Sequence, residues 1–151
     1  MRWADVDPAL ADVVRAEFKR RDVVIVGTLT ADGSPRVSAV DTCFLDDELV
    51  LAMMWQSRKA VDLLRDPRLV LHSPICSNTG RELEAIVRGR ANDVRDEGTR
   101  ERYLRTSGTP WEGRFHLFSV DVEAVSTIRY EGGEQHVVVW PKGKEFRRPY
   151  G

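Results

Sequence analysis

Two adjacent cations, Arg58 and Lys59, follow Ser57 where an apolar strand pattern gives way to a helical one. The first turn of a helix carries backbone N–H groups without partners and a partial positive charge. Cations at this end of a helix are therefore unfavourable unless an anion neutralises them. We interpret this segment as a candidate phosphate site. The residues alone also fit a surface helix that is capped by Ser57 and whose two cations are solvated.

A second candidate is the turn Gly33-Ser34-Pro35-Arg36, which leads into Val37 and Ser38. Small residues at such a turn would let a flat ligand approach the backbone, although an ordinary hairpin with small packed side chains is the better explanation of this segment alone. Apolar rings and thioethers that could line a planar group are scattered along the chain, and core packing is their commoner use. They are Met53, Met54, Trp55, Trp111 and Trp140.

Other catalytic and metal-binding patterns are missing. His72, His116 and His136 lack the spacing of metal ligands, and no nucleophile motif accompanies them. The glycine pattern of dinucleotide-binding folds is also absent. Cys43 and Cys76 are far apart, so we expect reduced thiols in a cytoplasmic protein.

Short β-branched runs separated by turn residues predict most of the elements that position these groups. Asp7 and Pro8 begin the first helix, because Asp caps a helix and Pro suits its first position. We expect further helices over 57–64 and 96–105 and strands over 23–29, 36–44, 49–54, 68–73, 83–94, 115–129 and 135–140. A bulge is expected at Gly89. The pattern predicts a mainly β protein of six or seven antiparallel strands, a barrel or a sandwich.

Composition limits the function classes. The chain has 151 residues, of which 42% are hydrophobic and 31% are charged, with a formal net charge of −1. This suits one domain over 1–151, in which 141–151 is expected to be an irregular basic tail. Near-neutral charge disfavours a nucleic-acid-coating protein. No apolar run approaches the length of about 18 residues that spans a membrane, and the first ten residues do not look like a signal peptide.

Taken in order, these pieces resemble the pyridoxamine 5'-phosphate oxidase-like family of split β-barrel flavoproteins. The resemblance covers roughly Val23 to Asp93, with a weaker pattern to Arg148. The matching segments are Gly27-Thr28-Leu29, Asp32-Gly33-Ser34-Pro35-Arg36, Ser57-Arg58-Lys59-Ala60, Asp66-Pro67-Arg68 and Gly89-Arg90-Ala91. The resemblance implies an FMN-binding split barrel that forms a homodimer, with the cofactor at the subunit interface and a small molecule as substrate.

The resemblance also implies site residues. Arg58 and Lys59, with Ser57, match the group that binds the FMN phosphate, and Glu84 falls where the oxidase has a flavin-contacting Gln. Other positions that match cofactor-contacting segments are Arg36, Val37, Ser38, Ala52, Met53 and Trp140. Trp140 would reach the cofactor from the C-terminal segment, in the other subunit.

At the substrate end the resemblance fails. Asp41 replaces the family's substrate-binding Lys, and a carboxylate there would repel a phosphorylated substrate. The family's closing R-L-H-D-R reads Phe146-Arg147-Arg148-Pro149-Tyr150 here. We therefore expect an FMN-dependent oxidoreductase that does not oxidise vitamin B6, with the deazaflavin F420 as an alternative cofactor. A cofactor carrier without turnover and a haem-binding protein on the same barrel are the other readings.

Overall fold

The computed structural model describes residues 1–21 and 23–150. Within these ranges the chain forms one short 3-10 helix, three α-helices and eight strands. In chain order they are η1 (Trp3–Asp5), α1 (Pro8–Lys19), β1 (Val23–Leu29), β2 (Pro35–Leu45), β3 (Glu48–Met54), α2 (Arg58–Arg65), β4 (Arg68–His72), β5 (Glu84–Asp93), α3 (Glu97–Ser107), β6 (Phe115–Glu131), β7 (Glu134–Trp140) and β8 (Lys144–Pro149).

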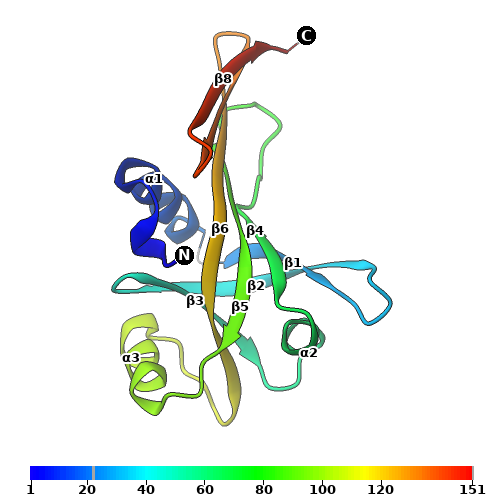
Figure 1. Ribbon diagram of the computed structural model, residues 1–151, viewed down its shortest axis with the longest axis vertical. Coiled ribbons are helices and arrows are strands. Elements are labelled where there is room, and N and C mark those ends of the chain that lie inside the picture. Colours follow the sequence, from blue (N-terminus) through cyan, green and yellow to red (C-terminus); the bar gives the residue numbers. More distant parts are fainter. Residues whose placement is uncertain (22, 151) are drawn as a thin grey trace.

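Six of the strands close into an antiparallel barrel. Their order is β3-β2-β1-β4-β5-β6, and a further pairing of β3 with β6 joins the two ends. In Figure 1, β5 and β6 follow the long axis while β1, β2 and β3 cross them, so two layers enclose the core. The predicted split β-barrel is confirmed, and the pairing of β3 with β6 leaves fewer free edges than an open sheet of the same strands would have.

Alternation of side chains along each strand fills this barrel. In β1, Val24 and Val26 point inward and are fully buried, while their neighbours are only half-buried. The main core also takes in Leu51, Leu71 and Val87 from other strands. Apolar inward positions at period two are the signal that made these strands predictable.

Gly89 lies at the predicted bulge, where the register between β5 and β6 shifts. A Cβ at this position would lie 2.2 Å from the backbone oxygen of Asp121, which is far inside contact distance. Only glycine therefore allows β6 to approach β5 so closely.

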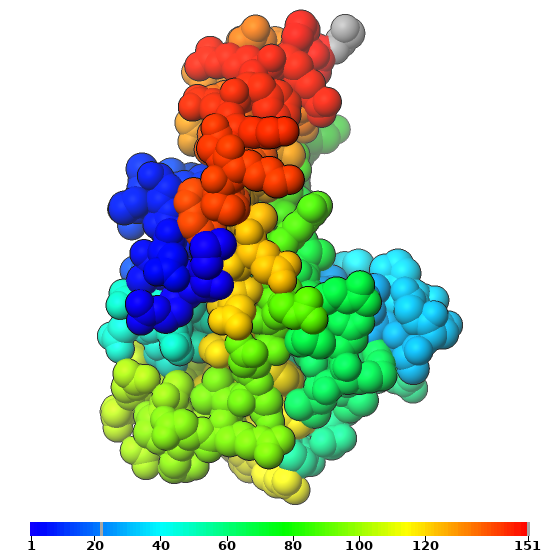
Figure 2. Space-filling model, viewed as in Figure 1, coloured from blue at the N-terminus to red at the C-terminus, as the bar shows by residue number. Residues whose placement is uncertain are grey.

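Strands β7 and β8 continue the sheet beyond the barrel. Figures 1 and 2 show this extension standing beyond the body of the molecule at the end away from α2 and α3. β8 pairs with β7 from Val139–Lys144 to Glu134–Pro149. The expectation of an irregular tail over 141–151 is therefore wrong for 144–149. The alternation of apolar and polar residues that would have revealed a strand is absent there, because every residue of β8 is exposed.

Three helices cover the barrel. Asp7 caps α1 by accepting a hydrogen bond from the Leu10 N–H at 3.0 Å, as the sequence predicts. α1 contributes Val14 and Phe18 to the main core. α3 lies over a smaller cluster around Tyr103 and Leu117, and α2 packs beside β1. Among the helices that the structure describes, none is long and apolar enough to cross a membrane.

Candidate functional site

The barrel is split where β2 and β3 part. They pair only from Leu45–Glu48 to Asp41–Ala52, whereas β3 pairs with β6 from Val50 to Met54, so the last two residues of β3 pair with β6 alone. Residues 35–40 of β2 pair with β1 alone, so this half of β2 has one edge without a strand. The start of α2 lies against that edge, where the Lys59 ammonium donates a hydrogen bond to the Ala39 carbonyl.

The first turn of α2 lacks a side-chain cap and an acidic residue to balance its charge. Ser57 occupies the N-cap position as predicted, but its side chain makes no capping hydrogen bond. Its Oγ is buried and has no partner among the described residues. This turn has no acidic residue, and the ion pairs within the described chain include neither Arg58 nor Lys59. Free N–H groups, a buried hydroxyl and two unpaired cations fit an anion such as a phosphate.

The two cations lie on different sides of this turn. Arg58 is exposed and borders an open cleft of about 620 Å³ between α2 and the β1–β2 hairpin, together with Thr30, Ser34 and Gln56. Lys59 is half-buried at the edge of β2. Burial lowers the pKa of Lys59 from its ordinary value, and the nearby Asp41 carboxylate opposes that shift. A bound anion would act in the same direction as Asp41.

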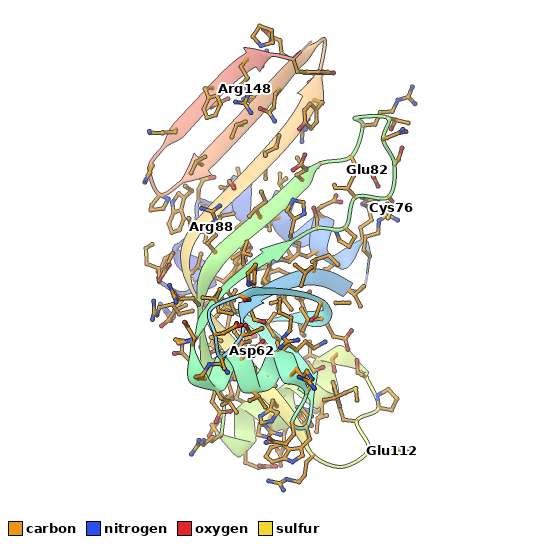
Figure 3. The ribbon with its side chains drawn as sticks, turned by 90° about the vertical axis from the view of Figure 1, so that its right-hand side faces the viewer. Asp62, Cys76, Glu82, Arg88, Glu112 and Arg148 are labelled. Atoms are coloured by element: carbon orange, nitrogen blue, oxygen red, sulfur yellow. The ribbon has the colours of Figure 1, made fainter. Side chains whose placement is uncertain are left out.

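Arg36 is bound by a carboxylate of the same chain. Its Nε donates to the Asp62 carboxylate at 2.7 Å, and Asp62 also accepts hydrogen bonds from Thr28 at 2.9 Å and Arg65 at 3.2 Å. Asp62 is only 3% exposed, and Figure 3 shows it in the lower half of the molecule, beside α2. Burial alone would raise the pKa of Asp62, but these hydrogen bonds hold it below its usual value.

Asp62 is the polar residue here that the sequence reasoning missed. The helical spacing of Ala60, Leu63 and Leu64 by itself indicates an apolar face, but Leu64 is 46% exposed and Asp62 is buried in its place. The partners that make this burial possible come from β1 and β2, so the helical pattern by itself carried no signal.

Four other candidate positions are divided between the faces of the barrel. Val37 points outward and is 71% exposed, whereas Ser38 is half-buried on the inner face. The side chains of Ala52 and Met53 are buried in the two hydrophobic clusters. Contact of these last two residues with a cofactor would have to use their backbone, at the point where β3 leaves β2.

Glu84 lies on the outer face of the sheet, away from the helix start. Its carboxylate is 3.5 Å from His72 Nε2 on β4 and accepts a hydrogen bond from Tyr130 on β6 at 3.2 Å. Gln135 on β7 donates to Tyr130 at 3.0 Å and accepts from Arg148 on β8. A polar chain thus crosses five strands and ends at Arg148, near the upper end in Figure 3.

Trp140 packs against the main core instead of this outer face. It lies opposite the buried Val125, so its ring is on the inner side of β7. Within one chain, the structure therefore brings together the β2 edge and the start of α2, but not Glu84 or Trp140. Their roles toward a cofactor stay predictions.

The three histidines differ in availability. His72 Nδ1 is 2.6 Å from the Ser73 carbonyl oxygen, which can only accept, so in the neutral ring Nε2 carries the lone pair. His136 Nε2 lies 2.7 Å from a carboxylate oxygen of Glu145. His116 is 5% exposed, and burial lowers its pKa. No group of three His, Cys, Asp or Glu side chains within residues 1–21 and 23–150 is arranged to hold a metal ion.

Comparison with solved structures finds the same fold in cofactor-binding proteins. A haem-binding protein of Mycobacterium smegmatis matches 95% of this chain with a TM-score of 0.67 and 19% identity, and the match spans 59% of that protein. A pyridoxamine 5'-phosphate oxidase-related, FMN-binding protein of Nostoc punctiforme matches 97% of this chain and 98% of its own, with a TM-score of 0.63 and 12% identity. HutZ, the haem storage protein of Vibrio cholerae, matches 76% of this chain and 90% of its own, with a TM-score of 0.57 and 16% identity.

At these identities the solved structures establish the fold. No curated protein sequence matches. The family model for pyridoxamine 5'-phosphate oxidase, however, matches residues 10–129, which include the whole barrel up to the last residues of β6. The chain therefore belongs to the pyridoxamine 5'-phosphate oxidase family.

Proposed function

We propose that this protein is an oxidoreductase that binds FMN at the split of the barrel. The observation that carries the proposal is the uncompensated first turn of α2. The Ser57 hydroxyl and the free N–H groups would donate hydrogen bonds to the phosphate, and Arg58 and Lys59 would neutralise it. FMN supplies hydride transfer when bound, so the chain needs no strong acid or base of its own.

The rest of the site would position the ring. Residues 36–38 offer the open edge of β2 as a backbone wall beside α2. Glu84 would accept a hydrogen bond where an amide could also donate one, because a carboxylate has only acceptor oxygens. Its orientation is held by the hydrogen bond from Tyr130, so it presents a set direction to a group on the outer face.

A homodimer belongs to this proposal. The outer face of the sheet carries apolar side chains from successive strands, among them Ile25, Val37 and Val70. Val37 at 71% and Phe146 at 43% exposure would be covered by a second copy of the chain, which would also cover Glu84. Light scattering during size-exclusion chromatography should give twice the mass of the chain, and a monomeric mass would remove this part of the proposal.

The substrate is proposed to be a small molecule without a phosphate group. Asp41 is half-buried in a cavity of about 380 Å³ that also takes in Lys19, Thr42 and Ser107. The Asp41 carboxylate balances the Lys19 ammonium there, so the cavity offers a phosphorylated substrate no net positive charge. Pyridoxamine 5'-phosphate should therefore be turned over poorly, as peroxide release would show.

Haem binding is the second candidate, because two of the structurally similar proteins bind or store haem. His72 suits an axial ligand best of the three histidines, since the Ser73 carbonyl leaves its Nε2 unprotonated in the neutral ring. The residues of the α2 start favour FMN over haem, because they are matched to a compact anion. F420 ends in a phosphate-bearing tail too and is the alternative ligand at the same turn.

Absorption and fluorescence titrations of the purified protein with FMN, F420 and haem, each alone, test the choice of cofactor. We expect tight binding of FMN with quenching of its fluorescence. A Soret band with haem that His72→Ala abolishes, together with no FMN binding, would replace the proposal by the haem alternative. A bound flavin that NADPH and other reductants cannot reduce would indicate a cofactor carrier instead of an enzyme.

A further inference from the structure

Another cavity lies on the far side of the Trp55–Gln56 turn from the cleft that borders Arg58. Its volume is about 410 Å³, within the range of small-molecule sites, and its walls include Trp55, Arg100, Arg114 and His116. We propose that this cavity binds a planar aromatic ring that carries an acidic group. None of these four side chains belongs to the proposed FMN site.

The floor of the cavity is a stack of rings. Trp55 lies parallel to His116, with centroids 4.3 Å apart and an angle of 9°, and His116 in turn lies 5.9 Å from Phe118. Trp55 is 41% exposed, and Arg114 lies 3.6 Å above its ring. A rigid indole that is fixed from below and covered only by a long flexible cation is a ready platform for a flat ligand.

His116 supplies a polar group that the protein leaves unsatisfied. The residue is 5% exposed, and its Nε2 is buried without a hydrogen-bond partner among the described residues. Buried polar atoms of this kind are rare in folded proteins and call for an explanation. Burial lowers the pKa of His116, so the ring is held in its neutral form, which has one donor and one acceptor nitrogen.

The charge around the cavity favours an acid. Arg95, Arg100 and Arg114 line it against the carboxylates of Asp93 and Glu97. Asp93 is paired with Arg95 at 2.8 Å, which leaves the other two arginines in excess over Glu97. Arg100 donates to the carbonyls of Val94 and Phe115, and no ion pair within the described residues includes Arg100 or Arg114. Arginine beside an aromatic platform is the pairing that recognises a planar carboxylate.

Calorimetric titration of the purified protein with 2-naphthoate tests this site. The uncharged 2-naphthamide serves as a ligand control, and we expect it to bind at least about tenfold more weakly, since a hydrogen bond to a charged group is worth that much. Arg114→Gln and Trp55→Leu should each weaken 2-naphthoate by about tenfold or more. Arg105→Gln, an exposed change on α3 outside this cavity, should leave the affinity unchanged.

Several outcomes would overturn the proposal. One is equal affinity for 2-naphthoate and 2-naphthamide. Another is no binding of 2-naphthoate at millimolar concentration, and a third is undiminished binding of 2-naphthoate by Arg114→Gln. Loss of FMN affinity in Trp55→Leu and Arg114→Gln would also overturn it, because the cavity would then be part of the flavin site. The Arg58→Ala, Lys59→Ala double variant should still bind 2-naphthoate. The proposed function and this second site can therefore fail separately.

Discussion

Within the described chain, charged groups lack ion-pair partners at the first turn of α2 but have them at Asp62, further along the same helix. At the first turn, Ser57 Oγ is buried without a partner, and neither Arg58 nor Lys59 has an ion-pair partner among the described residues. One turn further on, Asp62 is buried with a full set of hydrogen bonds from Thr28, Arg36 and Arg65. The start of α2 therefore has polar groups without partners, whereas Asp62 within the helix has its hydrogen bonds satisfied.

The difference separates a structural role from a binding role. A buried carboxylate is tolerated only when its hydrogen bonds are satisfied within the fold, so Asp62 ties α2 to β1 and β2. A helix start that keeps free N–H groups and adds two cations loses stability unless something else satisfies it. That is the behaviour expected of a site that awaits an anionic ligand.

The largest expected effect comes from a change at Asp62, whose hydrogen bonds are satisfied within the fold. Asp62→Asn removes the charge that three donors share, and it leaves Arg36 partly buried without its partner. We expect the free energy of unfolding to fall by about 2 kcal/mol, the scale of a hydrogen bond to a charged group. Urea unfolding at neutral pH measures this loss, and an unchanged midpoint would contradict the structural role of Asp62.

The same carboxylate predicts an acid-sensitive window. Its hydrogen bonds hold the pKa of Asp62 below the ordinary 3.8, so its stabilising contribution is present above that pH. The contribution is lost as the pH falls through the lower pKa of the folded state. The difference in unfolding free energy between the wild type and Asp62→Asn should therefore shrink below about pH 4. A constant difference from pH 7 to pH 2 would be inconsistent with this linkage.

A smaller loss is expected from Thr28→Val. The valine keeps the shape of the buried threonine but deletes the hydroxyl that donates to Asp62, while Arg36 and Arg65 remain. We expect about 1 kcal/mol, the net contribution of one ordinary hydrogen bond. A loss as large as that of Asp62→Asn would mean that the three donors act as one inseparable unit.

The smallest effect should have the opposite sign. Arg58→Ala relieves the unfavourable placement of an exposed cation at a helix start, and we expect a gain of a few tenths of a kcal/mol in the ligand-free protein. Thermal unfolding without cofactor tests this. A clear loss of stability would show that this side chain helps to hold the fold together and is not kept for a ligand.

The sequence predicted the barrel better than it predicted the site. Strands such as β1 were readable because Val24 and Val26 alternate with half-buried neighbours. β8 was missed because all of its residues are exposed, so its place depends on pairing with β7 and not on periodicity.

For the site, the helix start at Ser57 could be predicted, since the residues that signal a helix start lie within a few positions of one another. The burial of Asp62 was not, because Thr28 and Arg36 lie 34 and 26 positions away in the chain. The separation of Glu84 and Trp140 onto opposite faces likewise depends on register across β5, β6 and β7, which no single segment specifies.

The central claim is that the first turn of α2 binds the phosphate of a cofactor. Calorimetric titration of FMN and of riboflavin, which lacks the phosphate, into the wild type and into the Arg58→Ala, Lys59→Ala double variant tests it most directly. We predict that the double variant binds FMN at least about 100-fold more weakly, the scale of two charge-assisted contacts, while riboflavin binds both proteins equally and weakly. Equal affinity for FMN in the two proteins would contradict the account.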